Sequence, residues 1–172
     1  MSTTHTIIDS PIGELILVAD GATLSGVYFP GHWTRPDPAT FGERSERRLE
    51  QVEQQLAEYF AGERTTFELA TSARGTAFQR QVWDLIKRIP YGQTTTYGRL
   101  ASELGNPTLA RKVGNAVGHN PLSVIVPCHR VVGSDGALTG YAGGLERKTA
   151  LLRLEAARGP GSRQAAKQME MH

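Results

Sequence analysis

The stretch Ile125-Val126-Pro127-Cys128-His129-Arg130 holds the single cysteine of a 172-residue chain. A lone cysteine cannot form a disulfide within the chain or supply a cluster of thiolate metal ligands, so it is either a small buried side chain or a nucleophile. The apolar run from Leu122 to Val126 predicts a buried strand, and Pro127 should mark its end because proline cannot donate to a sheet ladder. We therefore expect Cys128 where a strand opens into a site, beside cationic neighbours of the kind that lower a thiol pKa.

The composition sets wide limits on the class of protein. Hydrophobic residues make up 39% of the chain, which is enough for a core in one domain or in two small ones that share an interface. No apolar run approaches the roughly 18 residues of a membrane span, and residues 1–5 lack the pattern of a signal peptide. Because no internal disulfide is possible, we expect a reducing, cytoplasmic location. A net charge of +2 does not by itself indicate a nucleic-acid-binding protein, so any basic surface must be local.

The first half predicts a small αβ unit. Short apolar runs separated by turns over residues 6–29 predict an antiparallel sheet, and residues 30–42 read as a loop. From Glu43 the pattern is helical and Gly62 is a stop signal; the expected apolar face holds Leu49, Val52, Leu56, Tyr59 and Phe60. Residues 63–75 read as a strand and a linker, which gives expected domains of residues 1–74 and 75–158, followed by a disordered tail at 159–172.

The second half is predicted to be mainly helical. Thr76 and Gln79 form a capping-box pattern at the start of a helix that ends near residues 90–92. Two short helices, at about 96–104 and from Asn106 to Gly118, form a helix-turn-helix candidate. Residues 134–136 predict a tight turn and a hairpin, and a last helix follows Gly144. Its expected apolar face holds Leu145, Thr149, Leu152 and Ala156, with Leu151 and Leu154 flanking it.

The second helix of this pair has an unusual outer face. Ala110, Arg111, Gly114, Asn115 and Gly118 place one long cation among almost no other side chain. Interior glycines each cost roughly 1 kcal/mol of helix propensity, so they suggest close approach to another surface. That surface is either a narrow groove or another part of the protein, and spacing alone leaves both open. The basic residues Arg99, Arg111, Lys112 and Arg130 near this region favour DNA modestly.

The second half resembles the O6-alkylguanine-DNA alkyltransferases, a family of repair proteins. The resemblance lies in Asn120-Pro121, Pro127-Cys128-His129-Arg130-Val131 and Gly140-Tyr141-Ala142-Gly143-Gly144-Leu145, with the helix-turn-helix at the expected distance upstream. It implies an α+β fold: a small ribonuclease H-like antiparallel sheet with a helix, then a mainly helical domain with a short active-site strand. It also implies a single-turnover S-methyltransferase that moves an alkyl group from O6 of guanine, with O4 of thymine left open, to Cys128.

The resemblance also assigns roles to individual residues. Glu155 would hold His129, which would activate Cys128 through a water, since adjacent side chains on a strand point to opposite faces. Asn120 matches the family's hinge and is also a good turn residue before proline. Tyr97 and Arg111 match the residues that expose a flipped base, while Ala110, Gly114 and Asn115 would face the minor groove, which is only about 6 Å wide.

A second group would hold the flipped base. Tyr141, Ala142 and Gly143 resemble the loop over the base, where glycines would let main-chain amides come close. The carbonyl of Val131 would accept from the guanine amino group, Lys148 would order the loop, and Arg130 would brace the two halves.

Neither a cofactor nor a metal is expected. Some family members hold zinc in the first domain, but here that half lacks cysteine, and His5 and His32 would make a poor site. We expect double-stranded DNA as the partner, a monomer in solution with clustering on DNA left open, and no membrane association. Two alternatives remain at this point: a helix-turn-helix regulator with a structural cysteine, and a hydrolase with a Cys–His–Glu triad.

Overall fold

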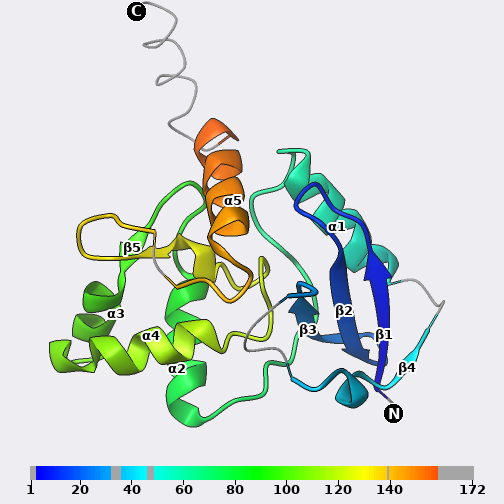
Figure 1. The fold of residues 1–172 in the computed structure, drawn as a ribbon, viewed down its shortest axis with the longest axis horizontal. Coiled ribbons are helices and arrows are strands. Elements are labelled where there is room, and N and C mark those ends of the chain that lie inside the picture. Colours follow the sequence, from blue (N-terminus) through cyan, green and yellow to red (C-terminus); the bar gives the residue numbers. More distant parts are fainter. Residues whose placement is uncertain (1–2, 32–35, 46–48, 139, 159–172) are drawn as a thin grey trace, which may run out of the picture.

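The computed structural model describes residues 3–31, 36–45, 49–138 and 140–158. A four-stranded sheet in the order β3-β2-β1-β4 occupies the first half (Figure 1); its strands are β1 (Thr3–Ile8), β2 (Leu15–Asp20), β3 (Thr23–Tyr28) and β4 (Glu43–Arg44). The strands β1, β2 and β3 are antiparallel, as predicted. The helix expected from Glu43 begins only at Glu50, because Glu43 and Arg44 pair in parallel with β1 instead.

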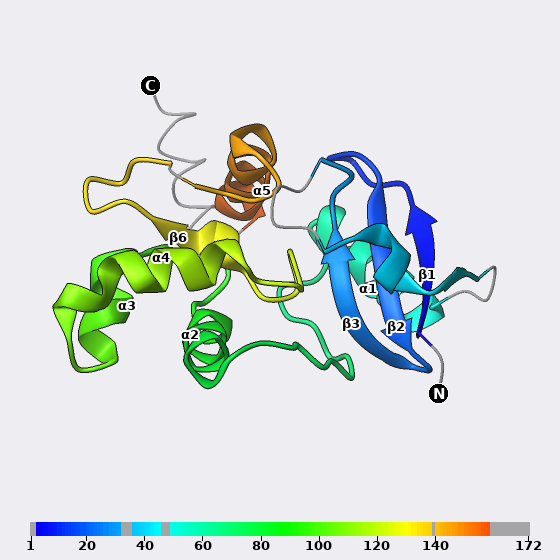
Figure 2. The same cartoon turned by 60° about the horizontal axis from the view of Figure 1, so that its bottom comes forward.

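The helix α1 (Glu50–Phe60) lies beside this sheet (Figures 1 and 2). It buries Val52, Leu56 and Tyr59, as its pattern predicts, and the chain turns at Gly62 with a φ of 77°. The strand expected within residues 63–75 does not form. That segment makes only one bridge, from Thr71 to Leu24, so it is an extended linker along the sheet edge.

Five helical segments build most of the second half: α2 (Ala77–Lys87), α3 (Tyr97–Glu103), the 3-10 helix η2 (Pro107–Leu109), α4 (Ala110–Gly118) and α5 (Leu145–Arg158). The capping box at α2 is present, since Thr76 Oγ1 accepts from Gln79 N and Gln79 Oε1 accepts from Thr76 N. The predicted pair of short helices is confirmed as α3 and η2–α4. The indole Nε1 of Trp83 on α2 donates to the carbonyl oxygen of Ala116 at 2.8 Å and ties α2 to α4.

The two halves share one hydrophobic core. Buried residues from β2, β3 and α1 pack in the same cluster as those from α2, α4 and α5. The edge strand β3 also bonds to the second half, because Val27 N donates to Pro121 O at 2.8 Å and Ser123 N donates to Val27 O at 3.3 Å. The chain just before Cys128 therefore covers the edge of the first-half sheet.

The strand predicted over Leu122 to Val126 is wrong. Only Leu122 forms a bridge, and the following residues turn, with Val126 N bonded to Leu122 O and Val124 at a φ of 72°. The run is apolar because it is packed in the core, and burial alone does not distinguish a strand from a buried turn. Cys128 opens the 3-10 helix η3 (Cys128–Arg130), and a two-residue strand, β6 (Val131–Val132), comes after it.

The end of the chain departs from prediction in two further ways. The tight turn at residues 134–136 forms, but within the described residues β6 pairs in parallel with β5 (Thr95–Thr96) and not in a hairpin. The buried face of α5 carries Lys148, Leu151 and Glu155, whereas Leu145 is 48% exposed. The expected apolar face was wrong because two of the buried positions are charged. The expected tail at residues 159–172 lies outside the described residues.

None of the helices in the described ranges has the length and apolar character needed to span a membrane.

Candidate active site

Cys128 lies inside the protein, with 4% of its surface exposed. A 3-10 helix has three residues per turn, so the side chains of Cys128, His129 and Arg130 leave η3 about 120° apart and reach different surroundings. This replaces the alternation expected from a strand. It explains how three consecutive buried polar residues each find their own partners.

His129 and Glu155 meet, as the resemblance implies. Nε2 of His129 lies 2.7 Å from Oε2 of Glu155, and both side chains are at most 1% exposed. Burial favours a raised pKa at Glu155, but hydrogen bonds from His129 and Arg130 outweigh it and hold this pKa at about 2. Burial lowers the pKa of His129. A neutral imidazole that donates from Nε2 to an ionised carboxylate keeps Nδ1 as its acceptor nitrogen, and Nδ1 is buried without a hydrogen bond to the described residues.

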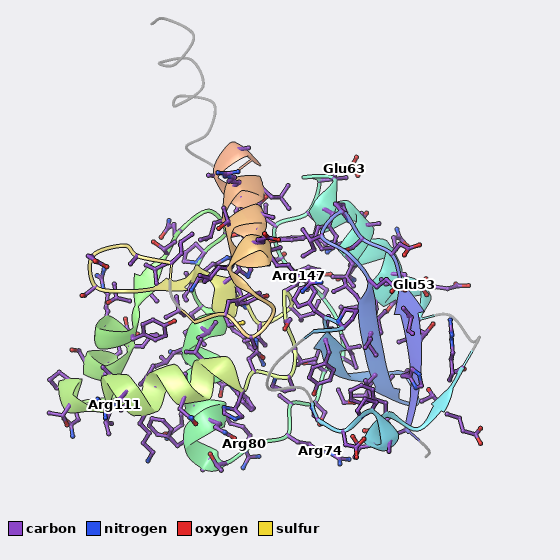
Figure 3. The ribbon with its side chains drawn as sticks, in the orientation of Figure 1. Glu53, Glu63, Arg74, Arg80, Arg111 and Arg147 are labelled. Atoms are coloured by element: carbon purple, nitrogen blue, oxygen red, sulfur yellow. The ribbon has the colours of Figure 1, made fainter. Side chains whose placement is uncertain are left out.

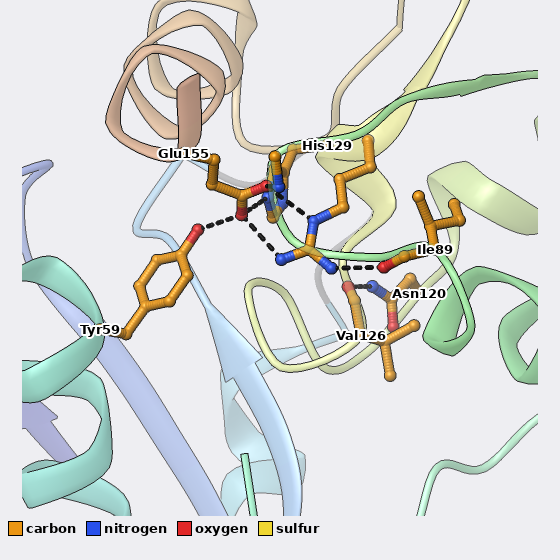
Figure 4. Close-up of polar contacts among 8 residues, drawn as sticks. Tyr59, Ile89, Asn120, Val126, His129 and Glu155 are labelled. Carbon is orange, nitrogen blue, oxygen red and sulfur yellow. Dashed lines mark hydrogen bonds and ion pairs between the residues drawn. The ribbon is translucent and has the colours of Figure 1, made fainter. Parts of the chain in front are cut away.

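Arg130 was counted among the basic residues that favour DNA binding, and this was wrong. Its side chain is buried and belongs to the cluster around Glu155. Its Nε and Nη2 donate to the two oxygens of Glu155 at 2.7 and 2.9 Å, and its Nη1 donates to Ile89 O (Figure 4). The first-half contact to this carboxylate comes from Tyr59, whose hydroxyl donates to Oε2. The sequence places Tyr59 on the apolar face of its helix, because helical periodicity does not reveal that a buried hydroxyl has a polar partner elsewhere in the chain.

The cation near the thiol is Lys148. Burial raises the pKa of the Cys128 thiol, and a hydrogen bond from Asn120 and the positive charge of Lys148 oppose that rise. Tyr141 lies beside the Cys128 thiol. Burial raises the pKa of Tyr141, and the negative charge of a Cys128 thiolate would raise it further. A cation does lower the thiol pKa, but it is Lys148 and not the expected neighbours His129 and Arg130, and its effect is smaller than that of burial.

Asn120 joins the end of α4 to the reactive segment. Its Nδ2 donates to Val126 O at 2.9 Å and its Oδ1 accepts from Leu122 N at 3.0 Å (Figure 4). Asn120 was expected both to form a turn before Pro121 and to link the helix-turn-helix to the cysteine segment, and these two contacts serve both purposes. With both ends of the amide used, residues 122–126 are held in a shape that their own backbone bonds do not fully specify.

Lys148 is fully buried and its Nζ donates to Val131 O at 2.6 Å. Burial lowers the pKa of Lys148 to about 8. The side chain of Lys148 is thus tied to the strand that follows Cys128, and its backbone N donates to Gly144 O at 3.1 Å in the loop that it was expected to order. The carbonyl of Val131 retains one further lone pair for another donor.

The loop at residues 140–144 packs over this region with Tyr141, Ala142 and Gly143 buried. Gly140 and Gly144 have φ values of 49° and 93°, which side chains rarely adopt. Gly143 has another reason: a Cβ there would lie 2.5 Å from the ring of Phe29. Packing against Phe29 therefore requires a glycine here, and the expected contact of the Gly143 amide with a bound base stays a prediction.

Arg147 connects this loop to the first half. Its Nη1 donates to Gly143 O at 2.9 Å, its Nε donates to Ile12 O at 3.1 Å, and its guanidinium lies over the ring of Phe29. Sequence reasoning missed Arg147, because its role depends on a turn more than a hundred positions away.

The outer face of α4, for which the sequence left both a groove and packing on the protein open, is exposed at Arg111 and Asn115, whereas Gly114 lies near the ring of Tyr97. Figure 3 shows Arg111 on the opposite side of the molecule from Glu53 on α1 and from Glu63, which follows that helix. A Cβ at Gly118 would meet nothing within 4 Å, so packing within the described chain does not require this glycine. Tyr97 lies between this helix and the loop, close to Gly114 on one side and to Gly140 on the other.

No group of three or more His, Cys, Asp or Glu residues within the described ranges could hold a metal ion. Nδ1 of His5 contacts Gly42 O, and His32 lies outside the described residues.

Two family models match almost the whole chain. The model described as "6-O-methylguanine DNA methyltransferase, ribonuclease-like domain" matches residues 4–73, and the "DNA binding domain" of the same description matches residues 77–157. The chain belongs to the 6-O-methylguanine DNA methyltransferase family. The resemblance drawn from residues 120–145 is thus confirmed.

Relatives in this family are similar over most of their length. A "Methylated-DNA--protein-cysteine methyltransferase" of Mycobacterium tuberculosis is 48% identical over 161 residues, which cover 89% of this chain and 92% of the relative. One of the same name from Methanosarcina acetivorans is 43% identical over 151 residues, covering 88% and 97%. The crystal structure of Mycobacterium tuberculosis OGT in complex with DNA superposes with a TM-score of 0.85 at 45% identity, covering 92% of this chain and 96% of that one. The predicted α+β fold is confirmed by these structural neighbours.

Proposed function

We propose that this protein repairs DNA by taking an alkyl group from O6 of guanine onto Sγ of Cys128, once per molecule. The observation that carries the proposal is the buried Cys128 beside His129, which Glu155 holds, in a chain whose relatives are named protein-cysteine methyltransferases. A helix-turn-helix regulator with a structural cysteine is not favoured, because those relatives are named for a reaction at cysteine.

The reaction is an in-line displacement. Sγ of Cys128 attacks the alkyl carbon, an S–C bond forms, the C–O6 bond breaks and its electron pair moves to the oxygen of guanine. Guanine leaves readily only if this developing charge is neutralised by a proton or by hydrogen bonds. The thioether product has no easy hydrolytic exit, unlike an acyl-enzyme, so each molecule reacts once.

The thiol needs a base, because burial raises its pKa. His129 supplies that base in our proposal: it is neutral, and its Nδ1 makes no bond to the described residues. A bridging water carries the proton from Sγ to Nδ1, and Glu155 remains ionised and fixes the imidazole. Asn120 and Lys148 stabilise the thiolate by a hydrogen bond and by charge.

A guanine inside a duplex cannot present O6 to a buried thiol, so the nucleotide must leave the stack. We propose that α4 enters the minor groove through Ala110, Gly114 and Asn115, and that Arg111 fills the space of the flipped base. The hydroxyl of Tyr97 donates to the departing guanine. Its position between α4 and the loop at 140–144 supports this role, since it lies where groove and base pocket would meet.

The base pocket completes the proposal. The loop of Tyr141 and Ala142 covers the base, and the carbonyl of Val131 accepts from its amino group. The protein acts as a cytoplasmic monomer.

The decisive experiment incubates the protein with duplex DNA that carries labelled O6-methylguanine. We expect equimolar label on the protein, lost in Cys128→Ala and retained in a control that alters an exposed residue of α5, Arg153→Ala. Repeated turnover would indicate a hydrolase, and DNA binding without label would indicate a regulator.

A further inference from the structure

The carboxylate of Glu155 has an unusual number of donors. Oε1 accepts from Arg130 Nε and Gly92 N, and Oε2 accepts from His129 Nε2, Arg130 Nη2 and the hydroxyl of Tyr59. Four of these groups belong to the second half of the chain. The hydroxyl of Tyr59 comes from α1, in the region that matches the ribonuclease-like domain, so the first half reaches the cluster behind the nucleophile.

Tyr59 is held rigidly. Its side chain is fully buried, and its ring lies 5.4 Å from the rings of Phe60 and Phe67 and 6.1 Å from that of Tyr91, measured between centroids. Burial and the adjacent Glu155 charge raise its pKa far above the ordinary value. The hydroxyl therefore keeps its proton and acts only as a donor, from a ring packed against three other aromatic rings.

We propose that Tyr59 is a positioning residue for alkyl transfer: its hydroxyl fixes the Glu155 carboxylate and sets how strongly this carboxylate polarises His129. The proposal rests on the function proposed above, in which His129 accepts the thiol proton. The hydroxyl and the imidazole share one oxygen, Oε2, so each donor reduces the negative charge that the other experiences.

The direction of the effect follows from the groups that surround His129. Glu155 on α5 favours the imidazolium form, whereas Arg130 on η3 and Lys148 on α5 disfavour it, and burial disfavours it most. Tyr59 on α1 meets His129 only through Oε2. Without the hydroxyl, more negative charge at Oε2 faces the imidazole, so the imidazolium becomes more stable and the neutral base is lost at a higher pH.

The test is Tyr59→Phe in the full chain, which keeps the ring. The rate of alkyl transfer from free O6-benzylguanine to Cys128 is measured against pH. We expect the midpoint of its acid limb to lie about one pH unit higher in the variant, so that the reaction on that limb is roughly tenfold slower. NMR titration of the His129 imidazole should show a shift of the same sign. The packing control is Phe67→Leu, which loosens the ring's surroundings but keeps the hydroxyl, and its midpoint should not move.

A second variant guards against a folding defect. Tyr59→3-fluorotyrosine keeps the ring and makes the hydroxyl a stronger donor, so the midpoint should move to lower pH. Unchanged midpoints in both Tyr59 variants, with the proteins folded, would overturn the proposal. If the unaltered protein takes no alkyl group from O6-benzylguanine and also takes no label from duplex DNA that carries O6-methylguanine, the proposed function fails, whereas the NMR titration still decides whether Tyr59 controls His129.

Discussion

Lys148 and Val131 are joined inside the protein by a 2.6 Å hydrogen bond from the ammonium group to the main-chain carbonyl oxygen. Val131 follows η3 directly, so this bond anchors the chain on the far side of Cys128, as Asn120 does on the near side. The same ammonium is the cation whose charge acts on the thiol. One buried lysine thus serves both the shape and the charge of the site.

Replacing Lys148 by Met should raise the thiol pKa, because a positive charge that favours the thiolate is lost. The rate of Cys128 alkylation by iodoacetamide, measured against pH, should therefore show its midpoint at a higher pH than in the unaltered protein. Arg153→Met, on an exposed position of the same helix, is the matched control and should leave the midpoint in place. A midpoint at the same or a lower pH in Lys148→Met would contradict the assigned role.

The same substitution predicts a change in stability with pH. The pKa of Lys148 is lowered to about 8 in the folded protein, whereas it is about 10.4 in an unfolded chain. Between these values the unfolded state binds more protons, so the free energy of unfolding should rise with pH. Relative to Lys148→Met, the unaltered protein should gain stability from about pH 8 to pH 10.4 in urea titrations, and a flat difference would count against the buried ammonium.

Glu155→Gln should lower the free energy of unfolding by about 3–5 kcal/mol near pH 7, because it leaves the buried Arg130 without its anion. The folded pKa of about 2 lies below the unfolded value of about 4.3. The carboxylate's contribution is therefore fully present above about pH 4.3 and lost as the pH falls towards 2. Urea titrations at pH 7 and pH 3 should show the deficit shrinking in acid, and Glu146→Gln, on the exposed side of α5, should show no deficit at either pH.

Arg111→Ala should impair repair of a duplex more than reaction with free O6-benzylguanine, which needs no flipping. We expect a loss on the order of tenfold for the duplex and little change for the free base. Arg111 is exposed at the open face of α4, away from the cluster at Cys128, so the thiol itself should be unaffected. Equal losses for both substrates would rule out the flipping role.

Two glycine substitutions should have opposite effects on stability. Gly118→Ala adds a Cβ that meets nothing, so it should stabilise α4 by up to about 1 kcal/mol while weakening DNA binding. Gly143→Ala places a Cβ 2.5 Å from Phe29, so the melting temperature should fall. Thermal melts and duplex binding of both variants check this pair, and a Gly118→Ala protein with unchanged DNA affinity would show that α4 does not approach DNA there.

Local signals in the sequence predicted the elements that depend on local bonds. The helix α2 begins where Thr76 and Gln79 cap each other, and α3 begins after Thr96, whose side chain accepts from Arg99 N. Both caps are predictable because their bonds close within three residues. The turn at 122–126 was mistaken for a strand because its shape depends on the buried amide of Asn120 and on pairing with Val27, neither of which an apolar run reveals.

The candidate site was predicted where family motifs carry it and missed where distant segments complete it. His129 and Glu155 meet as expected, but the hydroxyl of Tyr59 reaches the same carboxylate from 96 positions away in the sequence. The buried face of α5 was likewise misplaced, since hydrophobic periodicity cannot register Lys148 and Glu155 as interior residues. Burial of a charged side chain can be predicted only when the groups that pair with it are known.

The bond from Trp83 to Ala116 has a practical consequence. The chain has two tryptophans, and Trp33 lies outside the described residues, so Trp33→Phe leaves one indole whose ring is buried and whose N–H points at the backbone of α4. Indole emission responds to the dipoles around it, and here the nearest is a carbonyl of the helix that carries Arg111. The fluorescence of Trp83 would therefore report any change in the position of that helix, both on addition of DNA and after alkylation of Cys128.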